Sequence, residues 1–318
     1  MRRVRLFAGA LLAAPISAFA AQDSNIRFPV ARVETLLRDS TFKPVAREGS
    51  RYEGDRTQHV LLAFSDTVAI EVKWAPAPPG GEAFNNQPRY EMAAYALQKL
   101  FLDERDYVVP PTVLRMVSPT ALTGQGGGEP SKSTFSGIPA TLVVLQYWSS
   151  DVTPEQVFDP KRADRDSVYA RHLGDLNILT YLIRHRDANK GNVLMSVDSA
   201  NPRLFSVDNG VSFASPPSDR GADWQFMRVE RVSAGTAARL RAITDEQLTQ
   251  SLAVLAQFQP QGDAYVPVAS GPNMGSDRGV RQKGKTVQLG LTKYEIDGVR
   301  SRLRSLVKDI ERGKLGTF

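Results

Sequence analysis

The spacing of polar residues between positions 181 and 213 constrains this 318-residue chain more than any other feature. An apolar segment ends at His185-Arg186-Asp187, and Asn192 follows five positions after Asp187. Two short apolar runs with a polar, Pro-containing turn between them then lead from Asn192 to Asp208-Asn209-Gly210. The pattern predicts a hairpin that brings Asn192 and Asp208 side by side, although they are far apart in the sequence.

The order of these residues is typical of phosphoryl-transfer sites. In such sites a loop of the form H-R-D-x-x-x-x-N precedes a hairpin and a metal-binding Asp that is followed by Gly. Asp187 would accept or orient the proton of an attacking hydroxyl, while Asn192 and Asp208 would bind the Mg²⁺ that bridges the nucleotide phosphates. Oxygen ligands suit this cation. Each motif alone is also compatible with an ordinary turn, but both together favour a kinase-like site.

Two further polar residues occur upstream in the order that a nucleotide site requires. Residues 59–64 and 67–74 predict a hairpin, and its second strand ends in Ala-Ile-Glu-Val-Lys73-Trp. This strand is similar to the V-A-I-K strand whose lysine binds the α and β phosphates. Glu91 lies near the start of a predicted helix over 89–101, where a kinase has the acid that pairs with that lysine. The alternatives are a surface lysine and an acid favoured by the helix dipole.

A predicted buried strand over residues 140–148 ends at Gln146 and Tyr147. In a kinase layout the two lobes join here, so we expect the adenine of a nucleotide to meet the chain at these two residues. Residues 47–55 contain Gly49 and Gly54 without the G-x-G-x-x-G spacing. A plain turn is therefore favoured there over a loop that covers phosphates.

Residues 1–20 have the layout of a cleavable export signal, with arginines first, then an apolar segment, then Ala18-Phe19-Ala20. We expect cleavage before Ala21 and a periplasmic or secreted mature protein. No later segment is long and apolar enough for a transmembrane helix. The net charge of +6 is mild, and no basic-aromatic pattern of a nucleic-acid-binding protein occurs. The absence of cysteine excludes disulfides and Cys-based zinc sites.

These patterns predict an α+β chain with a two-lobed, protein-kinase-like fold. The first lobe, residues 21–148, would contain a small antiparallel sheet with the Lys73 hairpin and the Glu91 helix. The second lobe, residues 149–318, would be mainly helical. Two segments are expected to be irregular. Residues 120–139 are Gly-rich and predict a mobile insertion, and residues 259–290 are rich in Pro, Gly and polar residues and predict a disordered loop.

Helix signals in the second lobe are stronger. Residues 166–185 are apolar enough to form a buried helix beneath the Asp187 loop. Residues 235–243 predict a short helix. Thr244 with Gln247, and Thr292 with Glu295, are capping-box pairs that predict the starts of two more.

Residues 89–97 and 109–117, together with the core around Asp187 and Asp208, resemble the Golgi casein kinase family of secretory-pathway kinases. That family is an atypical branch of the protein-kinase-like superfamily. The last two core motifs are also similar to type II phosphatidylinositol 4-kinases. The resemblance implies ATP with Mg²⁺ or Mn²⁺ as cofactors, a Lys73–Glu91 pair on the phosphates, Asp187 as the catalytic Asp and Asp208 as the metal ligand. Asn192 matches conventional kinases better than these relatives.

The function predicted from these features is metal-dependent transfer of the ATP γ-phosphate to a hydroxyl. Protein Ser/Thr is the favoured acceptor, by family likeness alone, and a lipid or small-molecule hydroxyl is the open alternative. A pseudokinase that acts as a binding or scaffold protein is a rival, because little ATP is expected outside the cytoplasm. A third explanation, an unrelated domain with chance motifs, predicts that Lys73, Glu91 and Asp208 would not converge.

Overall fold

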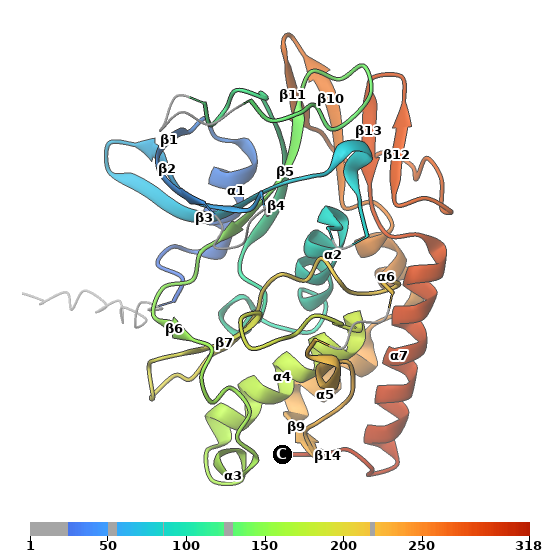
Figure 1. Ribbon diagram of the computed structural model, residues 1–318. Coiled ribbons are helices and arrows are strands. Elements are labelled where there is room, and N and C mark those ends of the chain that lie inside the picture. Colours follow the sequence, from blue (N-terminus) through green and yellow to red (C-terminus); the bar gives the residue numbers. More distant parts are fainter. Residues whose placement is uncertain (1–24, 50–55, 85, 124–129, 217–219) are drawn as a thin grey trace, which may run out of the picture.

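The computed structural model describes residues 25–49, 56–84, 86–123, 130–216 and 220–318. Antiparallel sheets occupy the upper part of the molecule in Figure 1, and most of the helices lie below them. The predicted export signal, most of the Gly49–Gly54 turn and part of the predicted insertion at 120–139 lie outside the described residues. Within the described ranges, no helix combines the length and apolar character needed to cross a bilayer.

A five-stranded antiparallel sheet carries Lys73, and its strand order is β1-β2-β3-β5-β4. Its strands are β1 (Lys43–Gly49), β2 (Gln58–Ser65), β3 (Val68–Pro76), β4 (Thr112–Val117) and β5 (Thr141–Tyr147). The predicted hairpin of β2 and β3 is present, and side chains alternate between the two faces along β3. Ile70 and Val72 are buried on one face, under Val33 and Leu37 of α1 (Val30–Asp39). Lys73 therefore points to the opposite face, toward the rest of the molecule.

The segment predicted to be a disordered loop forms a second sheet. Its four antiparallel strands, in the order β11-β10-β13-β12, are β10 (Ala256–Gln261), β11 (Ala264–Pro267), β12 (Val280–Lys283) and β13 (Thr286–Leu289). Phe258, Val287 and Leu289 pack with Leu114 and Val144 of the first sheet. Phe135 and Ile138, from the predicted mobile insertion, are buried in the same cluster. The disorder prediction for 259–290 was therefore wrong, because these strands pair with one another and their few apolar residues pack onto the first sheet.

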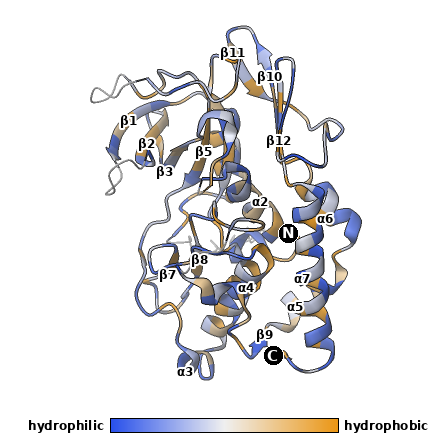
Figure 2. Ribbon diagram, turned by 45° about the vertical axis from the view of Figure 1, so that its right-hand side comes forward, coloured by the Kyte–Doolittle hydropathy of each residue, from blue (hydrophilic) through white to orange (hydrophobic). Residues whose placement is uncertain are grey.

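The helices of the lower part surround α4 (Ser167–Ile183), which runs beneath the Asp187 loop as predicted. The others are α2 (Pro88–Gln98), α3 (Pro160–Ala163), α5 (Ala234–Ala242), α6 (Asp245–Leu252) and α7 (Lys293–Glu311). Both predicted capping boxes are present, at the starts of α6 and α7. α2 and α4 share one hydrophobic core with α7, through residues such as Leu97, Leu179 and Leu303. Figure 2 shows hydrophobic residues along α4 at the centre of this core.

The predicted hairpin between Asn192 and Asp208 is present as β7 (Val193–Ser196) and β8 (Leu204–Ser206). β6 (Val152–Thr153) extends this small sheet, and β9 (Arg231–Val232) pairs in parallel with β14 (Gly316–Thr317) near the C-terminus. The backbone N–H of Val207 donates to the carbonyl of Asn192, 2.9 Å away. The hairpin therefore places the residue before Asp208 directly beside Asn192.

Candidate active site

Three charged residues from distant parts of the chain meet beneath the first sheet. Lys73 comes from β3, Glu91 from the first turn of α2, and Asp208 from the end of the β7–β8 hairpin. The Lys73 ammonium donates to Glu91 Oε1 at 2.8 Å and also contacts Asp208 Oδ1. Lys73 and Glu91 are buried, whereas the Asp208 side chain is 51% exposed. The site therefore has an enclosed ion pair with one carboxylate open to solvent beside it.

The second carboxylate oxygen of Glu91 also accepts a hydrogen bond. Glu91 Oε2 accepts a hydrogen bond from the backbone N–H of Asn209 at 2.9 Å. The Asn209 side chain is fully buried and forms two hydrogen bonds with Ser206. The Ser206 hydroxyl donates to Asn209 Oδ1 at 2.7 Å, and Asn209 Nδ2 donates to the Ser206 carbonyl at 3.2 Å. These contacts hold Asp208 at φ 54°, a conformation that Asp tolerates better than most residues. The sequence indicated only a turn at Asn209, so its bracing role was missed.

The Asp187 loop is fixed by short-range hydrogen bonds. Asn192 Nδ2 donates to the backbone carbonyl of Asp187 at 2.6 Å and lies 3.4 Å from Asp187 Oδ2. Asn189 Nδ2 donates to Asp187 Oδ1 at 3.2 Å. The backbone N–H of Asp187 donates to His185 Nδ1 at 3.3 Å. Both Asp187 carboxylate oxygens are thus oriented by amides. Asn189 was not among the predicted site residues, because a side chain that braces a loop leaves no periodic pattern in the sequence.

Burial determines the electrostatics of this loop. It lowers the pKa of His185 to about 4, so the imidazole is neutral at pH 7 and serves as a hydrogen-bond acceptor rather than as an acid. Burial raises the pKa of the Asp187 carboxyl above its ordinary value, against the opposing effect of the Asn189 hydrogen bond and the charge of Arg220. Burial lowers the pKa of Lys73, but the charges of Asp208 and Glu91 outweigh it and the net shift is upward. Lys73 is therefore a permanent cation.

Asp208 and Asn192 have the chemistry expected of magnesium ligands. Asp208 supplies an open carboxylate, and because Asn192 engages Asp187 through Nδ2, its Oδ1 remains as the oxygen for a cation. Mg²⁺ commonly binds one or two protein oxygens and completes its shell with water and phosphate. Among the residues that the structure describes, no three His, Cys, Asp or Glu side chains cluster as a metal site. Two such protein oxygens suit a cation whose remaining ligands are water and phosphate.

Four polar side chains form a row across the inner face of the first sheet. His59 lies opposite Lys73, Lys73 opposite Gln146, and Gln146 opposite Thr112, and residues directly opposite in antiparallel pairs share a face. Gln146 Nε2 donates to the Thr112 hydroxyl at 3.0 Å. Trp148, two positions after Gln146, is 44% exposed and stacks on His59 with ring centroids 4.2 Å apart. The predicted nucleotide edge is therefore adjacent to Lys73 and ends in an aromatic pair.

The backbone at this edge is partly used by the sheet itself. The N–H of Tyr147 donates to the Pro111 carbonyl at 2.8 Å, and the N–H of Trp148 donates to the Glu71 carbonyl at 2.9 Å. The Gln146 side chain is buried, and the Tyr147 hydroxyl accepts from the N–H of Arg27 at 3.1 Å. Adenine contacts for these two residues stay a prediction, and they would require backbone groups other than the two N–H donors.

The segment after Asp208 packs closely onto both helix α2 and the Asp187 loop. The Phe213 ring lies 5.0 Å from the Tyr90 ring, between centroids, and so links this segment to the helix that carries Glu91. Gly221 has φ 64°, and a Cβ built on it would lie 2.1 Å from the carbonyl of Ala188, the residue after Asp187. Only glycine permits this approach.

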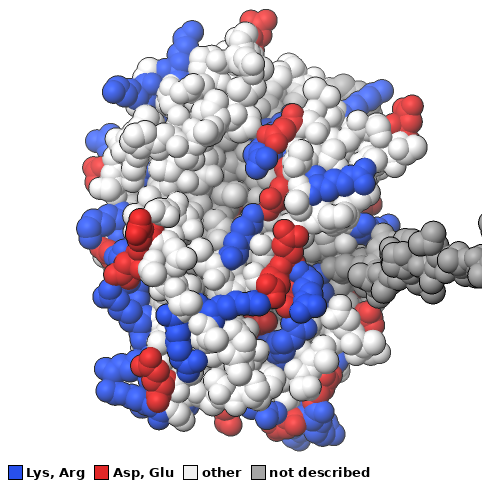
Figure 3. All heavy atoms as spheres, turned by 180° about the vertical axis from the view of Figure 1, so that it is seen from behind, with Lys and Arg blue, Asp and Glu red and all other residues white. Residues whose placement is uncertain are grey.

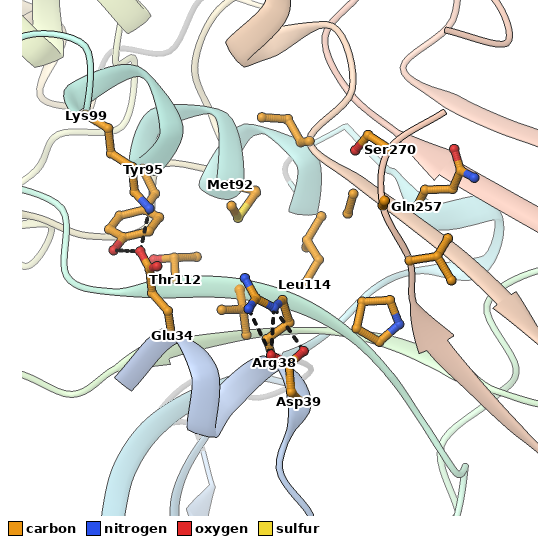
Figure 4. Close-up of a pocket in the computed structure, with 16 residues that line it drawn as sticks. Glu34, Arg38, Asp39, Met92, Tyr95, Lys99, Thr112, Leu114, Gln257 and Ser270 are labelled. Atoms are coloured by element: carbon orange, nitrogen blue, oxygen red, sulfur yellow. Dashed lines mark hydrogen bonds and ion pairs between the residues drawn. The ribbon is translucent and has the colours of Figure 1, made fainter. Parts of the chain in front are cut away.

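A cavity of about 410 Å³ lies away from these residues, between α1, α2, β4 and the second sheet (Figure 4). Its charged residues are engaged with one another. Arg38 is paired with Asp39, while Lys99 and the Tyr95 hydroxyl both contact Glu34. None of the predicted site residues Lys73, Glu91, Asp187, Asn192 and Asp208 lines this cavity.

The fold is similar to that of a solved structure described as hydra Fam20 with sugar, one of eleven matching chains. The TM-score is 0.53 at 14% sequence identity, over 93% of this chain and 92% of that chain. No protein-family model and no curated protein sequence matches the chain. The similarity shows that the chain has a mixed α+β fold like that of the Fam20 structure. The resemblance to type II phosphatidylinositol 4-kinases stays a prediction.

Proposed function

We propose that the chain is an exported phosphotransferase with a two-lobed kinase-like architecture. It would move the γ-phosphate of ATP to a hydroxyl, with protein Ser/Thr as the favoured acceptor. The observation that carries the proposal is the convergence of Lys73 and Glu91 on Asp208, at 2.8 Å for the ammonium–carboxylate pair. Chance motifs would not bring these residues together from β3, α2 and the end of β8. The Fam20-like fold over 93% of the chain supports the same conclusion.

Each side chain then has a defined task. Lys73, held by Glu91, would bind the α and β phosphates as a permanent cation. Asp208 and Asn192 would hold a Mg²⁺ or Mn²⁺ ion, which when bound neutralises charge on the β and γ phosphates. Asp187, whose carboxylate oxygens are oriented by Asn189 and Asn192, would accept or orient the proton of the acceptor hydroxyl. His185 fixes the position of the Asp187 backbone.

A pseudokinase that binds nucleotide or a partner without catalysis is the second candidate. The observation that favours it is the use of the Tyr147 and Trp148 N–H groups within the sheet, which removes two donors from the expected adenine edge. The intact polar cluster favours the enzyme.

Phosphate transfer tests the proposal directly. The chain from Ala21 onward would be incubated with ATP labelled on the γ-phosphate, Mg²⁺ or Mn²⁺, and separate Ser/Thr-rich protein, inositol-lipid and sugar acceptors. We expect label on the protein acceptor, lost in Asp187→Asn and retained in Asp198→Asn, a control in the exposed turn of the β7–β8 hairpin. Nucleotide binding without transfer to any acceptor, and without ATP hydrolysis, would instead favour the pseudokinase.

A further inference from the structure

Residues 25–29, which precede α1, lie against the linker that joins the two halves of the candidate site. This linker, residues 148–151, leads from β5 to β6. β5 belongs to the sheet that carries Lys73, whereas β6 pairs with β7 of the hairpin between Asn192 and Asp208. The conformation of the linker therefore sets how the Lys73 half of the site meets the half with the proposed metal ligands.

Asn25 forms three hydrogen bonds with the linker. Its side-chain Nδ2 donates to the carbonyl of Ser150 at 2.9 Å and to the carbonyl of Asp151 at 3.2 Å. Its backbone carbonyl accepts from the N–H of Ser150 at 3.2 Å. A primary amide carries two N–H donors on one nitrogen, which suits two successive carbonyls. Asn25 is fully buried, so its amide depends on these protein partners rather than on water.

The linker bends sharply at Asp151, whose φ is 53°. This left-handed conformation is uncommon outside glycine, so the contacts around Asp151 have to hold it. The Asp151 carbonyl also accepts from the N–H of Val197, the residue that follows β7, at 2.9 Å. The same carbonyl therefore receives one hydrogen bond from Asn25 and one from the β7–β8 hairpin, and the bend is held from both sides.

The two residues after Asn25 attach the same segment to the first sheet. The N–H of Arg27 donates to the Tyr147 hydroxyl at 3.1 Å. Ile26 is buried in the hydrophobic cluster that contains Tyr147 of β5 and Phe205 of β8. Residues 25–27 therefore contact the sheet of Lys73, the linker and the hairpin that leads to Asp208, and they hold these three parts together.

We infer that Asn25 is a positioning residue of the candidate nucleotide site, an inference that rests on the proposed function. Its amide holds the bend at Asp151, and the bend keeps the two halves of the site at the spacing that a metal–nucleotide complex requires. The Asp187 loop is held separately, by its own hydrogen bonds from Asn189 and Asn192. Loss of the Asn25 amide should therefore weaken nucleotide binding and leave the transfer step unchanged.

Steady-state kinetics of Asn25→Asp, in the chain from Ala21 onward, tests the inference. The substitution keeps the shape of the side chain but replaces the nitrogen that donates twice with a carboxylate oxygen. We expect the KM for ATP to rise about ten-fold, as for the loss of one or two hydrogen bonds, while kcat stays within about two-fold of the wild type. Val33→Ala is the matched control, because it truncates a fully buried side chain of the same hydrophobic cluster. It should lower the Tm and leave the KM unchanged.

Amide hydrogen exchange measures the linker without any nucleotide. In Asn25→Asp the N–H groups of Ser150 and Val197 should exchange about ten-fold faster, whereas the N–H of Trp148, which donates to Glu71 within the sheet, should keep its wild-type rate. Unchanged exchange at Ser150 and Val197 would overturn the inference, and so would an unchanged KM. A wild-type chain that binds no nucleotide would overturn the proposed function, and the exchange rates alone would then decide whether Asn25 positions the linker.

Discussion

At the scale of single residues, Glu91 is the most heavily used group of the site. One carboxylate oxygen accepts from Lys73 and the other accepts from the backbone of Asn209. A single side chain therefore sets the positions of both Lys73 and the segment that carries Asp208. Asp187 has a different environment, because amide groups orient it and it makes no contact with Lys73 in the hydrogen-bond network of the described residues.

Substitutions at Asp208 and Asp187 should therefore have different effects. A change at Asp208 should weaken nucleotide binding, whereas a change at Asp187 should slow phosphate transfer. Asp187→Asn should retain metal-dependent ATP binding and lower the rate of transfer by about 10²–10⁴-fold, the usual contribution of a positioned base. Asp208→Asn should weaken nucleotide binding itself. Single-turnover kinetics together with equilibrium binding measure both effects. Loss of ATP binding in Asp187→Asn, with its fold intact by circular dichroism, would contradict this assignment.

Asp175 in α4 should make stability depend on pH. Burial raises its pKa to about 7 against the opposing hydrogen bond from Thr236 at 2.7 Å. The folded chain therefore holds this proton more tightly than the unfolded chain, in which the pKa is about 4. The stabilisation is complete below the unfolded pKa and is lost as the pH rises to about 7.

The measurement is Tm against pH for the wild type and Asp175→Asn. Between pH 4 and 7 the advantage of the wild type over the variant should shrink as the pH rises. Parallel curves would show that Asp175 does not titrate in this range.

At the scale of elements, the position of α2 depends on α7. Arg89 of α2 forms a buried pair with Glu295 of α7, with bonds of 2.6 and 2.9 Å, and the Tyr90 hydroxyl contacts the same carboxylate. Both charged side chains are buried, at 6% and 4% exposure. Glu295 also completes the capping box of α7. Because Arg89 and Tyr90 immediately precede Glu91, this contact orients the helix that presents Glu91 to Lys73.

Breaking one side of the Arg89–Glu295 pair should therefore be costly. Arg89→Met should lower the free energy of unfolding by about 3–5 kcal/mol, because the buried Glu295 carboxylate loses its cation. Glu295→Gln should cost less, because Arg89 keeps its ion pair with Glu82 at 2.7 Å. The double variant should be less destabilised than the sum of the two. Lys293→Gln, which breaks an exposed pair on the same helix, should cost less than about 1 kcal/mol.

Urea unfolding of the four variants measures these values. Nucleotide affinity should fall with the single variants and recover in part in the double variant, which a general loss of stability would not produce. Additive effects of the two single changes would contradict a direct coupling.

At the scale of the whole molecule, the C-terminal part of the chain covers the N-terminal sheet. Strands of residues 256–289 cover the part of one face of the first sheet that contains Leu114 and Val144, while α1 covers the other face. Lys, Arg, Asp and Glu are interspersed over the back surface in Figure 3, so the net charge of +6 does not concentrate into one basic face there.

The contact between the two sheets should be needed for the stability of the first. Phe258 is fully buried between them, and Phe258→Ala should cost about 3–5 kcal/mol, the usual range for such a truncation. Phe84→Ala, at a site 73% exposed, is the matched control and should cost less than about 0.5 kcal/mol. Guanidinium unfolding measures both changes. A small effect of Phe258→Ala would show that the second sheet is only loosely attached.

Local patterns in the sequence were sufficient for most elements that build the site. The Lys73 hairpin, the Glu91 helix and both capping boxes depend on neighbouring residues, and the structure has them where they were predicted. The second sheet was missed because its strands are short and its polar residues read as solvated.

Those polar residues are in fact paired with one another. Gln288 Nε2 donates to Gln257 Oε1 at 3.0 Å, and Arg281 Nη1 lies 3.2 Å from Gln288 Oε1, so buried polar groups satisfy each other across three strands. Likewise, the buried contacts of Asn209 and Arg89 join residues more than 100 positions apart. Patterns among neighbouring residues in the sequence do not predict such distant pairs.

Metal-dependent ATP binding is the measurement that tests the central claim most directly. The Tm of the chain from Ala21 onward would be followed with ATP and Mg²⁺ or Mn²⁺, beside Asp208→Ala. At 100 times its Kd the nucleotide should stabilise the fold by about 2.7 kcal/mol. We predict a stabilisation that requires the metal and is abolished in Asp208→Ala. The absence of any shift with nucleotide and metal, in a folded protein, would contradict the assignment of Lys73, Glu91 and Asp208 to a nucleotide site.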